Sequence, residues 1–237
     1  MKIIFSPSKS MNFKDANKNC NKLNIRFLDS TNILINNLKN LNSEELSKLM
    51  KIKGKTLENV INFYKNFEIS SAQEAIYSYN GISFKQLELK KYNTDQLNYL
   101  NSNLIILSAL YGVVRPLDCI KEYRLDMTMK LLKDQTLYNF WKDKIKDYFD
   151  EDELIINLAS KEFSKMVSKP MINIDFKEYK NGNYKSISSY SKKGRGMMLN
   201  FMIKNRITNI EKIKEFNLDG YKLNPTLSDE FNFIFTR

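Results

Sequence analysis

The fold of this chain of 237 residues is decided by the stretch LIILSALYGVVRPLD at residues 104–118. Its first four residues form a continuous aliphatic run, which is typical of a strand buried on both faces. Residues 2–5 and 154–158 predict two further short strands of the same kind. Because helical segments lie between these strands without a regular βαβ period, we expect an α+β fold. It would be a single domain over residues 1–237, with a mixed β-sheet surrounded by helices.

The charge balance of the chain is strongly basic. Lys and Arg outnumber Asp and Glu by 38 to 27, which gives a formal net charge of +11. Such an excess favours anionic partners, above all nucleic acid or phosphates. The chain has no histidine, which excludes a Ser-His-Asp triad, a Cys-His dyad and a His-based metal site. No motif identifies a catalytic residue, so catalytic residues stay unknown, and we expect no cofactor and no metal.

Cysteine usage and the apolar segments bear on the location of the protein. Cys20 and Cys119 could pair, but we expect free thiols in a cytoplasmic protein. The N-terminal apolar run is too short for a signal peptide. No window reaches the ~18 apolar residues of a membrane span. We therefore expect a cytoplasmic location and no membrane partner.

Residues 43–68 predict two short helices around a tight, lysine-rich turn. The apolar frame of these helices resembles the helix-hairpin-helix motif of DNA-binding proteins, with a single turn glycine, Gly54, where that motif usually has two. In such a motif a helix N-terminus and free backbone N–H groups contact a DNA phosphate. Lys51, Lys53 and Lys55 would add positive charge around it. The alternative is an ordinary helical hairpin whose lysines are solvated.

Several polar side chains follow the predicted buried strands, or lie near their ends. The carboxyl ends of parallel strands share one edge of a sheet, so we expect these side chains to converge on one basic crevice that binds an anion. For Arg115 and Asp118 the alternative is a buried ion pair that pins an irregular loop. The candidate crevice residues are Ser6, Lys9, Arg115, Asp118, Tyr123, Arg124, Asn157, Lys193 and Arg195.

A second basic segment lies between a predicted hairpin and a predicted helix. Asn181-Gly182 supplies the turn of the hairpin, at residues 176–190, and residues 197–205 predict a helix. We interpret residues 190–196 as a loop with two flexible glycines and a phosphate site at the start of the helix. With the lysine turn, this gives a predicted DNA-binding set of Lys51, Lys53, Gly54, Lys55, Lys192, Lys193, Arg195 and Arg206.

These segments, in this order, resemble the YaaA family of bacterial peroxide-stress proteins. The stretches that carry the resemblance are FSPSK (5–9), LSALYGVVRPLD (107–118), YRLDM (123–127), LYNFW (137–141), INLAS (156–160), residues 191–196 with Asn205-Arg206, and FNLDGY (216–221). The resemblance implies a single α+β domain in the cytoplasm. It also implies a link to limiting intracellular iron under hydrogen peroxide stress, and DNA binding with a helix-hairpin-helix element.

Two functions remain open on this basis. The leading hypothesis is a stress-response protein that binds double-stranded or structured DNA, mostly through phosphate contacts. The alternative is an enzyme that acts on a phosphorylated or nucleotide-like small molecule in the crevice. In that enzyme Lys9 or Lys193 would serve as electrophile or base, Asp118 as acid, base or orienting group, and Arg115 and Arg124 as anion clamps.

Overall fold

The computed structural model describes residues 1–13, 20 and 23–237. Among these residues, eight strands form one sheet in the order β4-β3-β1-β6-β7-β10-β9, with β8 paired to β7 beside this path. The strands are β1 (Lys2–Phe5), β3 (Leu104–Ser108), β4 (Gly112–Val114), β6 (Ile155–Leu158), β7 (Ile172–Lys180), β8 (Asn183–Lys185), β9 (Lys222–Leu223) and β10 (Asn232–Thr236). A separate pair is formed by β2 (Gln73–Glu74) and β5 (Cys119–Ile120).

The centre of the sheet is parallel. β1 pairs in parallel with β3 on one side and with β6 on the other, and β6, β7 and β10 continue the parallel order. β4, β8 and β9 add antiparallel pairs around this centre. Every residue of β3 and β6 is buried, as expected for strands covered on both faces. The predicted strands and the mixed sheet surrounded by helices are confirmed.

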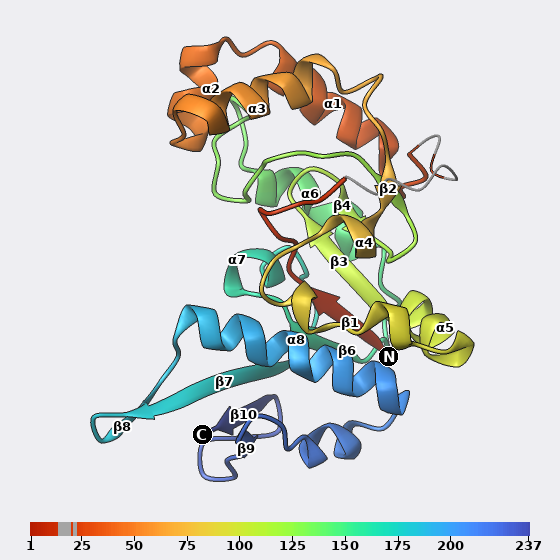
Figure 1. The fold of residues 1–237 in the computed structure, drawn as a ribbon, viewed down its shortest axis with the longest axis vertical. Helices are drawn as coiled ribbons and strands as arrows, with labels where there is room; N and C mark the ends of the chain where they lie inside the picture. The colour runs from red at the N-terminus through yellow and green to blue at the C-terminus, as the bar shows by residue number, and fades with distance from the viewer. Residues whose placement is uncertain (14–19, 21–22) are drawn as a thin grey trace.

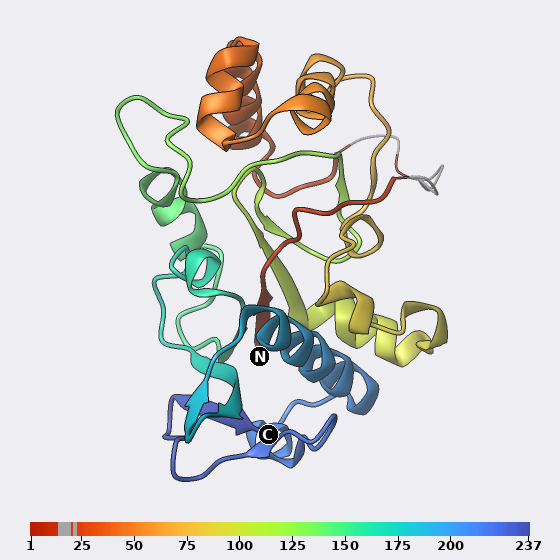
Figure 2. The same cartoon turned by 60° about the vertical axis from the view of Figure 1, so that its left-hand side comes forward.

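Helices cover both faces of the sheet, with α5 and α8 on one side and α6 and α7 on the other (Figure 2). The helices α1, α2 and α3 stand together beyond the β3–β4 end of the sheet (Figure 1). The α-helices are α1 (Leu28–Lys39), α2 (Ser43–Met50), α3 (Gly54–Lys65), α4 (Ala75–Ser78), α5 (Thr94–Asn103), α6 (Leu137–Lys146), α7 (Lys161–Ser164) and α8 (Ser188–Asn205). The 3₁₀ turns of the described residues are η1 (Phe84–Gln86), η2 (Leu89–Lys91) and η3 (Ile210–Glu215).

Helix α8 corrects the prediction of a flexible loop at residues 190–196. The hairpin turn at Asn181-Gly182 is confirmed, with φ of 53° and 80°. However, α8 already begins at Ser188, so Lys192, Lys193 and Arg195 lie within its first half.

The two glycines of this segment serve close packing of α8. A Cβ on Gly194 would lie 2.4 Å from the ring of Phe176, and one on Gly196 would lie 2.2 Å from the carbonyl oxygen of Ser83. Both distances are far too short for real atoms. Because these glycines have no side chains, α8 can contact β7 and the residue before η1 directly. The prediction of a loop failed because two glycines among polar and basic residues are also typical of a flexible loop.

The two cysteines also differ from expectation. Cys20 and Cys119 form a disulfide, with their Cα atoms 5.6 Å apart. Cys119 opens β5, and Asn24 holds the incoming chain there, because its side-chain oxygen accepts a hydrogen bond from the backbone N–H of Cys119. The prediction of free thiols is wrong, because Cys20 and Asn24, which precede α1 in the chain, both contact Cys119 at the start of β5.

Candidate functional site: a basic pocket at the sheet edge

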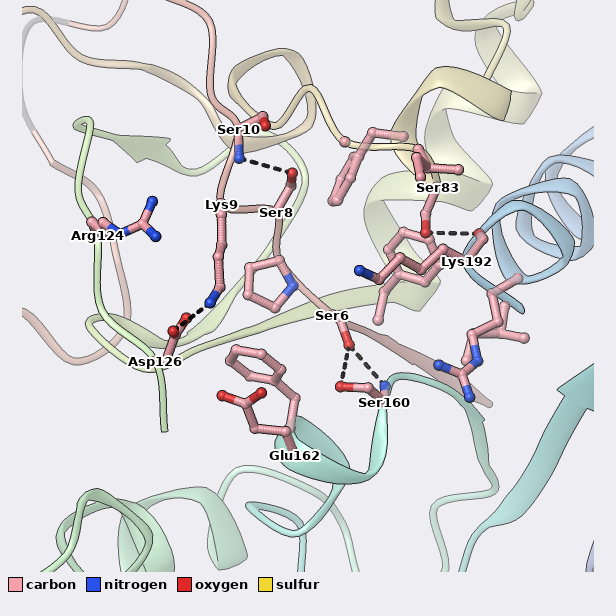
Figure 3. Close-up of a pocket in the computed structure, with 18 of the residues that line it drawn as sticks. Ser6, Ser8, Lys9, Ser10, Ser83, Arg124, Asp126, Ser160, Glu162 and Lys192 are labelled. Atoms are coloured by element: carbon pink, nitrogen blue, oxygen red, sulfur yellow. Dashed lines mark hydrogen bonds and ion pairs between the residues drawn. The ribbon is translucent and has the colours of Figure 1, made fainter. Parts of the chain in front are cut away.

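A pocket of about 330 Å³ opens where the parallel strands β1 and β6 end. Its walls come from five segments: the chain after β1, residues 81–84, residues 123–126, the start of α7 and the first half of α8. Figure 3 shows Lys9, Arg124 and Asp126 on one side of it and Ser83 and Lys192 on the other. The polar lining residues are Ser6, Ser8, Lys9, Ser10, Ser83, Tyr123, Arg124, Asp126, Ser160, Glu162, Lys192 and Arg195.

Two carboxylates and one lysine form the first wall. The Lys9 amine lies 2.6 Å from a carboxylate oxygen of Asp126. Glu162 is half-buried and accepts a hydrogen bond from the backbone N–H of Met127 at 3.1 Å. Burial raises the pKa of the Glu162 carboxyl, and the nearby Asp126 charge raises it further. Glu162 therefore holds a proton more readily than an exposed glutamate does.

The segment that carries this wall is clamped from two sides. The hydroxyl of Tyr64, on α3, donates to the carbonyl oxygen of Arg124 at 2.7 Å and accepts from the Arg124 backbone N–H at 3.2 Å. Tyr64 is almost fully buried, and burial raises the pKa of its hydroxyl well above the usual range. It therefore stays protonated and can make both bonds. On the other side, Glu162 on α7 holds Met127. The position of the Arg124 and Asp126 side chains thus depends on α3 and α7.

Helix α8 supplies the opposite wall. The Ser83 hydroxyl donates to the carbonyl oxygen of Lys192 at 2.8 Å, which fixes α8 against residues 81–84. Arg195 is mostly buried and pairs with Asp175 at 3.0 Å through one terminal nitrogen. Its neighbours Gly194 and Gly196 allow the close approach that brings the guanidinium to the pocket.

A serine pair joins the ends of the two central strands at the floor of the pocket. The Ser6 hydroxyl accepts a hydrogen bond from the backbone N–H of Ser160 at 2.8 Å and lies 3.2 Å from the Ser160 hydroxyl. Ser6 directly follows β1, and Ser160 lies two residues after β6. These bonds lock the two strand ends side by side, so the floor is rigid.

The cations of the pocket outnumber its carboxylates. Four basic side chains line it, Lys9, Lys192, Arg124 and Arg195, against two acidic ones. Within the described residues, the Nε atoms of Arg124 and Arg195 are buried and have no hydrogen-bond partner. Buried polar groups nearly always have a partner. The protein itself therefore leaves these two guanidinium groups incompletely hydrogen-bonded.

The structure brings together five of the nine predicted crevice residues. Ser6, Lys9, Tyr123, Arg124 and Arg195 line the pocket. The hydroxyl of Tyr123 is engaged below the surface, because it lies 2.8 Å from the Ser108 hydroxyl and 3.0 Å from that of Tyr79. Burial raises the pKa of Tyr123 to about 12. Its ring therefore shapes the wall, and its hydroxyl remains protonated.

Arg115 and Asp118 do not line the pocket. The Asp118 carboxylate accepts from the backbone N–H of Arg115 at 2.8 Å and from its Nε at 3.4 Å. The backbone oxygens of Pro116 and Asp118 accept from Ile76 and Ala75. Burial raises the pKa of Asp118. This is the pinned loop that the sequence left open as the alternative, so Arg115 and Asp118 do not join the other predicted crevice residues at the pocket.

Asn157 and Lys193 are also placed elsewhere. The Asn157 side chain donates to Asn173 at 2.8 Å and accepts from the backbone N–H of Ala159 at 2.8 Å, so it links β6 to β7. Lys193 pairs with Asp219 at 2.8 Å. Lys193 points away because the segment is helical, and its neighbour Lys192 lines the pocket in its place.

Sequence reasoning missed several lining residues. Asp126 lies within the quoted YRLDM stretch and Ser160 within INLAS, but neither was assigned to the crevice. Glu162 and Ser83 carry no local motif. They reach the pocket only because α7 and the segment before η1 pack at the same sheet edge.

The predicted lysine turn does not line this pocket. It lies at the α2–α3 hairpin, beyond the β3–β4 end of the sheet (Figure 1). Lys51, Lys53 and Lys55 are exposed, and within the described residues none of them forms an ion pair. Lys51 ends α2 in a left-handed conformation, with φ of 52°. The N-terminus of α3 has no side-chain cap and no acidic residue in its first turn. By contrast, Asn42 and Asn93 cap α2 and α5.

The other predicted DNA-binding cations are mostly engaged. Lys193 pairs with Asp219, Arg195 with Asp175, and Arg206 with Asp95 at 2.7 Å. The predicted set is therefore not one surface: the lysine turn lies on α2–α3, and the remaining cations lie along or at the end of α8. Within the described residues, no three His, Cys, Asp or Glu side chains gather as metal ligands would, and no helix is long and apolar enough to cross a membrane.

The fold and the pocket define a mixed α/β protein with a basic site at the carboxyl edge of its parallel strands. Its sequence matches the family described as "Peroxide stress protein YaaA" over residues 1–227. Whole-length relatives include UPF0246 proteins of Fusobacterium nucleatum, 49% identical over 100% of this chain and 99% of the relative, and of Francisella philomiragia, 40% identical over the full length of both. The chain belongs to the YaaA family of peroxide stress proteins, as its resemblance indicated.

Proposed function

We propose that this peroxide stress protein binds double-stranded or structured DNA through phosphate contacts at the α2–α3 hairpin. The observation that carries the proposal is the N-terminus of α3. Its first backbone N–H groups have no side-chain cap, and helix N-termini attract anions through such groups and through the helix dipole. Three exposed lysines surround it. Glu44 and Glu45 lie at the opposite end of α2, about 10 Å or more away along the helix.

Binding of this kind depends on salt rather than on base sequence. Each lysine that neutralises a phosphate releases condensed counterions, so the affinity falls with rising salt. Removal of one contact lowers the log–log salt slope by roughly 0.9 for duplex DNA. A triple variant, Lys51→Gln, Lys53→Gln and Lys55→Gln, should therefore lower the slope by up to about 2.7 and weaken binding at low salt.

The test is fluorescence anisotropy of a labelled duplex over a salt series. The matched control neutralises Lys180, Lys185 and Lys222, three exposed lysines of β7, β8 and β9 at the other end of the molecule (Figure 1). The control should keep the wild-type slope. An equal loss of salt slope in both variants would show that the net charge of the protein, and not the hairpin, sets DNA binding. Unchanged binding by the hairpin variant would contradict the proposed contact.

We further propose that the protein acts in the cytoplasm, where its binding to DNA helps to limit iron under peroxide stress. Ferrous iron reduces hydrogen peroxide to hydroxide and a hydroxyl radical, which attacks nearby DNA, so less available iron protects DNA. In cells that lack the native gene, the wild-type protein should lower the chelatable iron measured by electron paramagnetic resonance during peroxide exposure. The hairpin variant should not. Equal lowering by both proteins would separate iron limitation from DNA binding.

A further inference from the structure

We propose that the basic pocket is a second binding site, which takes a small phosphate monoester of about the size of a mononucleotide. The proposal does not rest on DNA binding at the hairpin. It rests on the unsatisfied guanidinium groups, the charge balance of the lining and the size of the cavity.

The two arginines provide the anion-binding groups. Arg124 makes no side-chain hydrogen bond or ion pair within the described residues, and its Nε is buried without a partner. The Nε of Arg195 is in the same state, although a terminal nitrogen of this side chain pairs with Asp175. A buried donor without a partner is costly, and guanidinium groups match the geometry of phosphate oxygens. A phosphate in the pocket would pair with the terminal N–H groups of Arg124, which form no hydrogen bond or ion pair within the described residues.

The charge of the pocket fits a phosphate group. The four lining cations exceed the two lining carboxylates by two, and Asp175, which does not line the pocket, pairs with one of these cations, Arg195. Lys192, which has no ion-pair partner within the described residues, faces the pocket opposite Lys9 and Arg124 (Figure 3). A phosphate monoester carries a charge close to −2 at neutral pH, whereas each phosphate of a DNA strand carries −1.

The remaining wall fits an organic group with hydroxyls. Asp126 and Glu162 offer carboxyl oxygens beside the cations, and serine hydroxyls line the floor. Phe84 and Phe163 add apolar surface. The cavity of about 330 Å³ lies at the lower end of the range for small-molecule sites. Inorganic phosphate alone would leave the apolar surface and the hydroxyl-binding oxygens of this wall without a ligand group.

The experiment measures binding to the full chain by calorimetry, at constant ionic strength. The probes are adenosine monophosphate, adenosine, glucose 6-phosphate and inorganic phosphate. We expect one of the two monoesters to bind, to raise the thermal midpoint by mass action, and to bind more tightly than inorganic phosphate. Adenosine, which lacks the phosphate, should not bind. Binding of adenosine as tight as that of its monophosphate, or equal binding of inorganic phosphate, would overturn the proposal.

Variants locate the site. Arg124→Gln should weaken monoester binding by about tenfold to a hundredfold, as expected for the loss of a charged hydrogen bond. Arg195→Gln should act in the same direction. The control Arg206→Gln removes the same charge from the far end of α8, where Arg206 pairs with exposed Asp95, and should bind normally. Monoester binding that neither pocket variant weakens would overturn the proposal. If Arg195→Gln proved unstable, Arg124→Gln alone would decide, because Arg124 is only partly buried and its substitution should leave the fold intact.

Two further arms separate the pocket from the hairpin. The variant Lys51→Gln with Lys53→Gln should bind the monoester as the wild type does, whether or not it binds DNA. If duplex DNA displaced the monoester and Arg124→Gln weakened both to the same extent, the pocket would hold a DNA phosphate. That result would overturn a small-molecule site.

Discussion

Tyr64 is the structural link between the hairpin and the pocket, and its hydroxyl can be removed alone. Tyr64→Phe keeps the ring in the core but deletes the partner of both the N–H and the carbonyl oxygen of Arg124. A buried backbone group left without a partner costs about 1–3 kcal/mol. Because Arg124 is half-buried and water can reach part of it, we expect a total loss of about 2–3 kcal/mol in the free energy of unfolding. For a chain of this size that corresponds to a midpoint lower by about 4–12 °C.

The assay is urea unfolding followed by circular dichroism, with monoester titration at a temperature where the variant is folded. The control is Tyr99→Phe, which removes a buried hydroxyl that donates to the carbonyl oxygen of Ile207, outside the pocket lining. Both variants should lose stability, but only Tyr64→Phe should weaken monoester binding, because it frees the backbone that positions Arg124. A Tyr64→Phe protein within about 0.5 kcal/mol of the wild type, the range of ordinary surface changes, would refute the clamp.

Three other changes give further tests. Cys119→Ser opens a disulfide whose cysteines are 99 residues apart, and the chain-entropy relation predicts that the free energy of unfolding falls by about 4–5 kcal/mol relative to the oxidised wild type. The reduced wild type should give the same urea unfolding curve as the variant, and a variant as stable as the oxidised protein would contradict this prediction. Because the pKa of Glu162 is raised, the folded state binds the proton more tightly than the unfolded state, so the contribution of Glu162 to stability falls as the pH rises above the usual glutamate range. Glu162→Gln, whose amide oxygen can still accept from Met127, should remove this part of the pH dependence of stability. An unchanged pH profile of the variant would contradict the prediction. Gly196→Ala places a methyl group against the Ser83 carbonyl and should cost about 1–3 kcal/mol through overpacking, although alanine favours a helix; a more stable variant in thermal unfolding would show that α8 can move away freely.

The sheet was predictable because its central strands are continuous aliphatic runs. A run such as residues 104–107 has no polar residue to face water, so only a strand covered on both sides accommodates it. The parallel order then brings the ends of β1 and β6 together, and Ser6 and Lys9 follow β1 directly. This is why these two residues were expected at one crevice.

The rest of the site depended on packing between distant segments. Arg115 and Lys193 are basic residues in segments that resemble a binding site. However, they form ion pairs with Asp118 and Asp219, and no local sequence pattern indicates these pairs. Glu162 reaches the pocket only through the position of α7. The glycines around Arg195 were interpreted as flexible, whereas each one fits a neighbour at close range; the sequence does not distinguish these two uses of glycine.

The disulfide also changes what a cut in the chain would do. It closes a covalent ring from Cys20 to Cys119, and α1 to α5 with the whole α2–α3 hairpin lie inside this ring. A protease that cleaves the lysine-rich turn would therefore leave one molecule of unchanged mass apart from the added water. The two fragments would separate only after reduction. The hairpin can thus be nicked without being released from the sheet and its pocket.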